Sequence, residues 1–227
     1  MVIVHHLDNS RSQRVLFLLE ELGVPYEVVH HRRDKKTMLA APALLAVHPL
    51  GKSPVIVDKD GDGDVTVAES GAILEYLVER YGDGRLEPAR GTPDHRRYTY
   101  WMHYAEGSLM PLLVMKLVFN RIEKSPMPFF VRPIARAISG QVKKLFIDPN
   151  LQRNVAYIES ELGRSEWLAG DAFTACDVQM SFPVEVAQAR GGVDADTPRL
   201  LAYIARLKAR PAYQRAVERG GPLQLSG

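Results

Sequence analysis

The spacing of apolar residues changes once along the chain, and this change constrains the fold more than any other feature. Up to residue 81, short β-branched runs alternate with stretches in which apolar residues recur every three or four positions. Beyond residue 93 only the helical spacing remains. Residues 83–92 carry Gly, Pro and charge without periodic apolar residues. We therefore predict an α/β domain over 1–82, a linker over 83–92 and an all-helical domain over 93–227.

The first domain is predicted to follow the order β-α-β-α-β-β-α. Its opening is a strand, a polar turn and a helix that stops at Gly23. The Gly- and Asp-rich segment 58–64 joins two short runs, as in a β-hairpin. The predicted strands are 2–7, 26–30, 54–57 and 65–67, and the predicted helices are 15–22, 37–47 (or an irregular turn) and 70–81.

The second domain contains only helical patterns. Thr92 and Pro93 begin it as an N-cap and a first-turn residue. The predicted helices are 93–122 with a kink at Pro111, 129–146, 150–163, 174–190, 198–209 and 211–219.

Composition excludes several classes of function. The net charge of +2 is too small for a surface that neutralises nucleic-acid phosphates, and a single cysteine, Cys176, permits no internal disulfide. The N-terminus lacks the pattern of a secretory signal. The longest apolar stretch, 109–119, contains Pro111 and Lys116 and is shorter than the ~20 residues of a membrane span. We expect a cytoplasmic protein with no nucleic-acid partner and no membrane span.

The turn after the first strand places hydroxyl groups at the start of a helix. Residues 8–14 read Asp-Asn-Ser-Arg-Ser-Gln-Arg, with Ser10 and Ser12 just before the helical pattern. Free backbone amides and the positive end of the helix dipole favour an anion there, and a thiolate is one such anion. The alternative is that Ser10 or Ser12 only caps the helix.

A second constellation follows at residues 51–55 and 69–73. Pro54 at the start of a strand can follow a cis peptide bond, which would turn the backbone groups of Ser53 toward a peptide ligand. Ser70 at a helix start can meet a carboxylate, and Glu69 can meet an ammonium. Each also has a structural explanation, because Pro54 limits an edge strand and Ser70 caps a helix.

Four motifs in order make the chain resemble the cytosolic glutathione transferases. They are SRSQRVLFLLEELGVPY at 10–26, HPLGKSP at 48–54, ESGAI at 69–73, and WLAGD at 167–171 followed by TACD at 174–177. The last resembles the family's capping box and buried helix. The likeness covers essentially the whole chain and is strongest to the bacterial and fungal subgroup with a serine-rich first turn. It implies a thioredoxin-like N-terminal domain with a mixed four-stranded sheet, a helical C-terminal domain, and a homodimer.

The resemblance also implies roles for individual residues. Ser10 occupies the place of the residue that activates the thiol of glutathione, the co-substrate. Ser53, after which Pro54 follows, would pair its backbone with the cysteinyl part, and Lys52 would lie near the glycyl end. Glu69 and Ser70 would hold the γ-glutamyl end. The basic or histidine ligand that some relatives place after the second strand is unassigned, although Lys35, Lys36 and Thr37 lie near.

The physical chemistry of a thiol agrees with this assignment. A free thiol has a pKa of about 8.5, and a shift of about two units is worth roughly 2.7 kcal/mol. One hydrogen bond to a charged acceptor together with a helix dipole supplies that much. Ser10 would donate to the sulfur and would not attack, since no histidine and carboxylate lie beside it in sequence. Ser12 and Asn9 remain alternatives to Ser10. With no cysteine in the first turn, thiol–disulfide exchange through the protein is not expected.

The electrophile would lie against the first long helix of the second domain. Tyr100, His103 and Tyr104 share one face of it, and Trp101 lies on another. We predict that the first three line the pocket, since an aromatic lining suits a flat apolar electrophile.

Two metal patterns are set aside. Residues 58–69 satisfy the calcium-loop pattern, but prolines and a strand precede them where a helix is required, so an acidic hairpin tip is expected. His5-His6 and His30-His31 are adjacent in strands and so point to opposite faces, and no metal site is predicted.

The sequence thus predicts a glutathione transferase that forms the thiolate for attack on a small apolar electrophile. The alternatives are another glutathione-dependent enzyme, such as an isomerase, lyase or peroxidase, and a non-catalytic protein that binds glutathione or another ligand.

Overall fold

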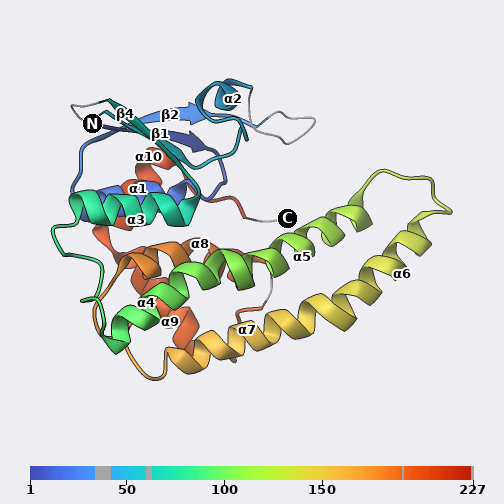
Figure 1. Ribbon diagram of the computed structural model, residues 1–227. Helices are drawn as coiled ribbons and strands as arrows, with labels where there is room; N and C mark the ends of the chain where they lie inside the picture. The colour runs from blue at the N-terminus through green and yellow to red at the C-terminus, as the bar shows by residue number, and fades with distance from the viewer. Residues whose placement is uncertain (34–41, 60–62, 191, 226–227) are drawn as a thin grey trace.

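The computed structural model describes residues 1–33, 42–59, 63–190 and 192–225 (Figure 1). Its sheet has the strand order β2-β1-β3-β4. β1 runs parallel to β2 and antiparallel to β3, and β3 runs antiparallel to β4, so the sheet is mixed as predicted. The strands are β1 (Val2–Leu7), β2 (Tyr26–His31), β3 (Val55–Lys59) and β4 (Asp64–Ala68).

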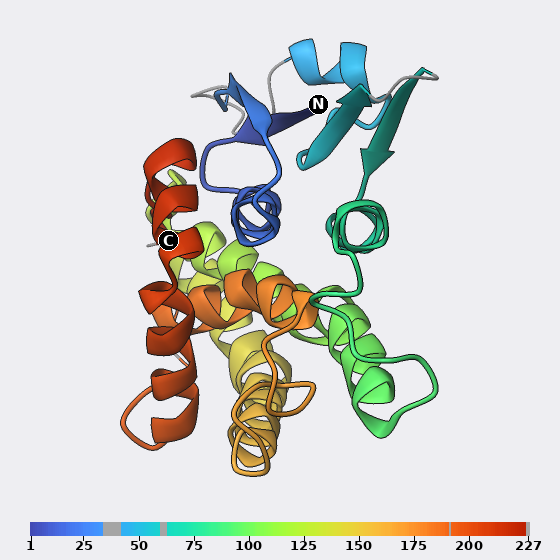
Figure 2. The ribbon, with the colours of Figure 1, turned by 90° about the vertical axis from the view of Figure 1, so that its left-hand side faces the viewer.

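Helices cover the two faces of this sheet unequally. α1 (Gln13–Leu22) and α3 (Ser70–Tyr81) lie against the face that looks toward the helical region, and α2 (Ala43–Val47) lies on the opposite side (Figures 1 and 2). α1 ends at Gly23, whose φ of 71° is the left-handed conformation that glycine adopts most readily. This arrangement confirms the predicted thioredoxin-like N-terminal domain. The predicted helix over 37–47 is present from Ala43, and its first part lies outside the described residues.

The connection over residues 82–92 contains no helix or strand and leads into the helical region. None of the helices in the described ranges is both long enough and apolar enough to cross a bilayer. The helical segments are α4 (Pro93–Tyr104), η1 (Ala105–Leu109), α5 (Met110–Lys124), α6 (Arg132–Val142), η2 (Lys143–Ile147), α7 (Asp148–Glu161), α8 (Ala175–Ala189), α9 (Pro198–Ala209) and α10 (Pro211–Gly220).

Two π-helical turns, η1 and η2, each lie just before a proline inside a long continuous helix. η1 joins α4 to α5 just before Pro111, and η2 joins α6 to α7 just before Pro149. A proline has no N–H to donate, and a widened turn accommodates it without ending the helix. The predicted break between residues 146 and 150 is therefore wrong, because one helix runs from Arg132 to Glu161. α5 and α6 form a hairpin that projects from the molecule (Figure 1).

α8 is the central helix of the helical region and is buried almost throughout. Thr174 and Asp177 form the predicted capping box at its start. The Asp177 carboxylate also accepts hydrogen bonds from the Leu168 amide (3.1 Å) and the Tyr203 hydroxyl (3.0 Å). α1 packs against both α8 and α10, so one continuous apolar core joins the sheet layer to the helical layer.

Candidate functional site

The turn between β1 and α1 does not use its serine side chains as helix caps. Ser12 stands at the N-cap position of α1 but makes no side-chain capping bond. Its hydroxyl instead lies 2.9 Å from Nδ1 of His6 and 2.7 Å from Oγ of Ser10. The explanation of Ser12 as only an N-cap is therefore wrong, because β1 provides His6 as a stronger partner.

The three residues considered for contact with a thiol, Ser10, Ser12 and Asn9, differ in burial and in hydrogen bonding. Ser12 is fully enclosed, with an exposed fraction of 0%, whereas 6% of Ser10 remains accessible. The Asn9 side-chain oxygen accepts a hydrogen bond from the Gln224 backbone amide at 2.6 Å. Ser12 is therefore enclosed away from the cleft, whereas Asn9 is exposed and its side-chain amide nitrogen can still donate, so Asn9 stays an alternative to Ser10.

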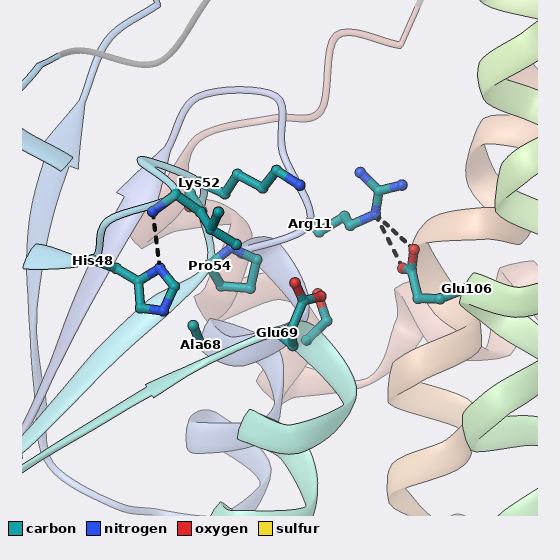
Figure 3. Close-up of a pocket in the computed structure, with 10 residues that line it drawn as sticks. Arg11, His48, Lys52, Pro54, Ala68, Glu69 and Glu106 are labelled. Atoms are coloured by element: carbon teal, nitrogen blue, oxygen red, sulfur yellow. Dashed lines mark hydrogen bonds and ion pairs between the residues drawn. The ribbon is translucent and has the colours of Figure 1, made fainter. Parts of the chain in front are cut away.

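A cleft of about 270 Å³ lies beside this turn and collects all five residues predicted to bind glutathione. Its volume is close to the lower end of small-ligand sites, roughly 300 Å³. Ser10 is not among the lining residues, but its neighbour Arg11 is. The lining consists of Arg11, His48, Leu50, Lys52, Ser53, Pro54, Ala68, Glu69, Ser70 and Glu106 (Figure 3).

Two backbone features shape the floor of the cleft. The Ser53–Pro54 peptide bond is cis, as the sequence suggested, and the Ser53 hydroxyl donates to the His5 carbonyl at 2.9 Å. Glu69 precedes α3 with a φ of 74°, a backbone conformation that non-glycine residues adopt rarely and mostly at functional sites. No side-chain bond caps α3, and Ser70 is its first residue. Glu69 and Ser70 both line the cleft, so the N-terminus of α3 lies at its edge.

The cleft brings both signs of charge together. His48 and Lys52 lie on one side of Glu69, and Arg11 and Glu106 lie on the other (Figure 3). A zwitterionic peptide needs such an arrangement, because its ammonium and its carboxylates require partners of opposite charge. An ammonium group would be favoured in the part of the cleft next to the Glu69 carboxylate. Carboxylates would be favoured next to Lys52 and next to the N-terminus of α3.

Glu106 joins the helical region to the first turn. Nε of Arg11 lies 3.0 Å from both carboxylate oxygens of Glu106, and one Arg14 terminal nitrogen lies 2.6 Å from Oε1. The other Arg14 terminal nitrogen donates to Gln179 on α8 at 2.7 Å. Burial lowers the pKa of the fully enclosed Arg14 to about 10, an effect that Glu106 opposes. Burial acts to raise the pKa of Glu106, but Arg14 and Arg11 hold it below its usual value.

Sequence reasoning missed Arg11, His48 and Glu106 as lining residues. Arg11 and His48 lie inside the motifs at 10–26 and 48–54, but neither was given a role. Glu106 could not be found from local sequence, because its partners Arg11 and Arg14 are more than 90 residues earlier in the chain. Lys35, Lys36 and Thr37, the residues considered for the missing basic ligand, lie outside the described residues.

The predicted electrophile residues on α4 do not gather at this cleft. Tyr100 and Tyr104 belong to an aromatic cluster with Trp101 and Tyr157 of α7, with ring centroids 4.9–6.1 Å apart. The Tyr104 hydroxyl donates to the Asn154 side chain. These tyrosines face α7 because their apolar rings are needed to pack the helices together.

His103 is exposed and lies one turn before Glu106 on the same side of its helix. Its contact with an electrophile stays a prediction, as do those of Tyr100 and Tyr104.

Adjacent histidines of β1 and β2 point to opposite faces of the sheet as expected, so that His5 lies beside His31 and His6 beside His30. His6, Asp8 and His30 each place a ligand atom within 4.8 Å of the other two, because parallel pairing sets His6 opposite His30. This group forms across two strands, so the pattern within one strand does not indicate it. Both ring nitrogens of His6 are already hydrogen-bonded, to Ser12 and to the Gly220 carbonyl.

Asp58, the first position of the calcium-loop pattern, is buried in β3. It accepts hydrogen bonds from the hydroxyls of Tyr76 (2.8 Å) and Tyr81 (2.5 Å) of α3. Its carboxylate is thus part of the contact between sheet and helix. The hairpin tip at residues 60–62 lies outside the described residues.

Comparisons with known proteins find relatives that match nearly the whole chain. Residues 10–80 match the family model for the glutathione S-transferase N-terminal domain. A curated relative, glutathione S-transferase 3 of Schizosaccharomyces pombe, is 38% identical over 96% of this chain and 88% of its own length. A glutathione S-transferase structure from Actinobacillus pleuropneumoniae superposes with a TM-score of 0.74 at 30% identity, covering 99% of this chain and 95% of that one. A family member from Pseudomonas fluorescens with two glutathione molecules bound superposes with a TM-score of 0.72 at 26% identity, covering 96% and 92%.

Proposed function

The chain belongs to the glutathione S-transferase family, and from this premise we propose that it binds glutathione in the cleft beside α1 and converts its thiol to a thiolate that attacks a small apolar electrophile. The observation that carries the proposal is the cleft itself, which gathers Lys52, Ser53, Pro54, Glu69 and Ser70 next to the first turn.

Each end of glutathione has a complementary group in this cleft. Glu69 takes the ammonium of the γ-glutamyl end, while the Ser70 hydroxyl and the α3 amides take its carboxylate. Lys52 takes the glycyl carboxylate. Ser53, with its cis peptide bond to Pro54, offers backbone groups to the cysteinyl part. This assignment places the cysteinyl sulfur between the two ends of the peptide and toward the first turn.

Ser10 is the residue that donates to the sulfur. Two observations support Ser10: Ser12 is fully enclosed, and Ser10 carries the partly accessible hydroxyl of the turn. The N-terminus of α1 adds a favourable dipole. The thiolate then attacks the electrophile, and a lone pair of the sulfur forms the new S–C bond. The electron pair of the bond that breaks in the electrophile departs with the leaving group or, in an addition to a double bond, goes to the far atom of that double bond, which is then protonated.

The chain's own thiol is unsuited to redox chemistry. Cys176 is fully buried in α8, and burial raises the pKa of its thiol well above the usual value. This observation favours a transferase, or another reaction of the glutathione thiolate, over disulfide exchange through a protein cysteine.

We also propose a cytoplasmic homodimer. Large apolar side chains stay exposed along α5, α6 and η2, among them Val118, Ile134, Ile138 and Leu145. Such a surface is typical of an interface between protein molecules. Light scattering coupled to size-exclusion chromatography would report a mass of two chains if this is right and of one chain if it is not.

Glutathione binding to the wild type and to Glu69→Gln tests the assignment of the cleft. Loss of a charged hydrogen bond costs about 1.5–3 kcal/mol, so the Kd for glutathione should rise roughly 10- to 100-fold. Glu75→Gln, an exposed change on the same helix, is the control and should leave the Kd unchanged. Equal affinity in all three proteins would refute the assignment of Glu69, and no binding to the wild type would refute the function.

A further inference from the structure

A chain of hydrogen bonds leads from Ser10 to a buried histidine. The Ser10 and Ser12 hydroxyl oxygens are 2.7 Å apart, and the Ser12 oxygen is 2.9 Å from Nδ1 of His6. The other ring nitrogen, Nε2, is 2.9 Å from the backbone carbonyl of Gly220 at the end of α10. Three elements, β1, the first turn and α10, thus hold one continuous path with an accessible end at Ser10.

The chemistry of the partners fixes the direction of each bond. A carbonyl only accepts, so the hydrogen on the His6 ring sits at Nε2. In the neutral ring Nδ1 is then an acceptor, and the Ser12 hydroxyl donates to it at 2.9 Å in preference to the Leu7 carbonyl at 3.4 Å. The Ser10 hydroxyl must in turn donate to Ser12. Ser10 cannot donate to a sulfur while all three bonds keep this direction.

We propose that His6 takes up the proton lost by the glutathione thiol, with Ser10 and Ser12 passing it along. This inference rests on the proposed function of Ser10. It explains how Ser10 becomes a donor to the thiolate, because reversing every bond of the path frees its hydrogen for the sulfur. Ser12 and His6 do not touch the thiol and act through Ser10 as positioning residues.

The step balances in atoms and charge. The S–H bond breaks and its electron pair stays on sulfur, while the proton goes to the Ser10 oxygen. Ser10 gives its own hydrogen to Ser12, and Ser12 gives its hydrogen to Nδ1 of His6. The products are a thiolate that accepts a hydrogen bond from Ser10 and an imidazolium. The net charge of the complex does not change, and no proton enters the solvent.

The groups around His6 suit this exchange. Burial lowers the pKa of His6, which keeps Nδ1 free to accept before glutathione binds, and His30 and His31 of β2 act in the same direction. The Gly220 carbonyl and Asp8 act in the opposite direction and stabilise the imidazolium. A nearby thiolate adds a further negative charge that favours the protonated ring.

The close fit of α10 holds the far end of the path in place. A side chain at Gly220 would bring its Cβ within 2.6 Å of the Gln13 side-chain oxygen and of Cδ1 of Leu16, and within 3.0 Å of Cε1 of His6. The backbone of α10 can approach His6 this closely because position 220 has no side chain. The Gly220 carbonyl therefore keeps the ring oriented with Nδ1 toward Ser12.

Nuclear magnetic resonance of the His6 ring in the wild type tests the proposal directly. The ring signals are assigned with His6→Gln and followed on addition of glutathione or S-methylglutathione, which has no thiol proton. We expect glutathione to convert His6 to the imidazolium form, and S-methylglutathione to leave it neutral. A neutral ring with both ligands overturns the proposal, and so does an imidazolium with both.

Titration of the bound thiol by its ultraviolet absorbance gives a second, independent readout. Ser12→Ala and His6→Gln should raise the pKa of the bound thiol toward the free value of about 8.5. The Kd of S-methylglutathione should change less than about threefold, because neither residue lines the cleft. Ser12→Thr keeps a hydroxyl and should restore the wild-type titration. His5→Gln, in the same strand but on the opposite face, is the matched control and should have no effect.

The outcomes separate this inference from the proposed function. If the wild-type thiol ionises early and depends on Ser10, but Ser12→Ala titrates like the wild type, the path to His6 is refuted and the transferase stands. If the wild type binds no glutathione, or the bound thiol titrates as in free solution, the proposed function itself fails.

Discussion

The ion pair between Glu106 and Arg14 should be the most costly polar contact to remove between the helical region and the first turn. Arg14 has no exposed side-chain surface, and Glu106 is the carboxylate that the described residues place against it, at 2.6 Å. Glu106→Gln keeps the shape and one acceptor oxygen but removes the charge. Breaking a buried pair from one side costs about 3–5 kcal/mol. We expect less, about 2 kcal/mol, because 34% of the Glu106 side chain is exposed and the amide oxygen can still accept from Arg14.

Urea and thermal unfolding at pH 7 measure this loss. For a chain of this size, 1 kcal/mol corresponds to about 2–4 °C, so the midpoint should fall by roughly 4–8 °C. Glu123→Gln is a matched control, because Glu123 of α5 pairs at 2.8 Å with Lys143 of η2, whose side chain keeps contact with water, whereas that of Arg14 is fully enclosed. Its loss should be below about 1 kcal/mol.

The same ion pair also predicts how the stability difference between the wild type and Glu106→Gln depends on pH. The two arginines hold the pKa of Glu106 below its usual value, so the carboxylate stabilises the fold above the unfolded pKa of about 4.3. That contribution is lost as the pH falls through the lower pKa of the folded state. The difference between the wild type and Glu106→Gln should stay constant from pH 8 to about 5 and shrink below about pH 4. A loss equal to that of Glu123→Gln at pH 7 would refute the reasoning.

Three further predictions concern the helical region. Asp177→Ala leaves the amides of Leu168 and Thr174 without their acceptor and should lower the free energy of unfolding by at least about 2 kcal/mol in urea titrations; an unchanged midpoint would contradict it. Cys176 is enclosed and its pKa is raised, so a thiol reagent should label it only after denaturation, and rapid labelling of the native protein would argue against this structure. Tyr104→Phe removes the hydroxyl that donates to Asn154 and should lower the free energy of unfolding by about 1 kcal/mol. The KM for an electrophile should stay nearly unchanged, and a large rise in KM would show instead that the Tyr104 hydroxyl contacts the substrate.

The sequence predicted the local structure of this chain well because each signal was local. Gly23 ends α1, Pro93 and Pro198 begin helices, and the capping box of Thr174 starts α8, all within a few residues of the pattern that predicted them. The cleft residues from 52–54 and 69–70 were also found, because they belong to motifs that occur in a fixed order.

The remaining features depend on contacts between distant residues. Glu106 is directed at Arg11 and Arg14 by a π-helical turn, and nothing in the local pattern distinguishes such a turn from an ordinary helix. Aromatic residues of both faces of α4, Tyr100 and Trp101 among them, contact Tyr157 of α7, and this contact between helices more than 50 residues apart has no local sequence signal. The path to His6 has the same origin, since it requires β1 and α10 to meet the first turn.

The pKa of the thiol of bound glutathione tests the central claim most directly. Its ultraviolet titration is measured at saturating protein for the wild type and for Ser10→Ala. The account predicts that the bound thiol ionises well below the free value of about 8.5 in the wild type and close to that value in Ser10→Ala. A bound thiol that titrates at the same pH in both proteins would contradict the account.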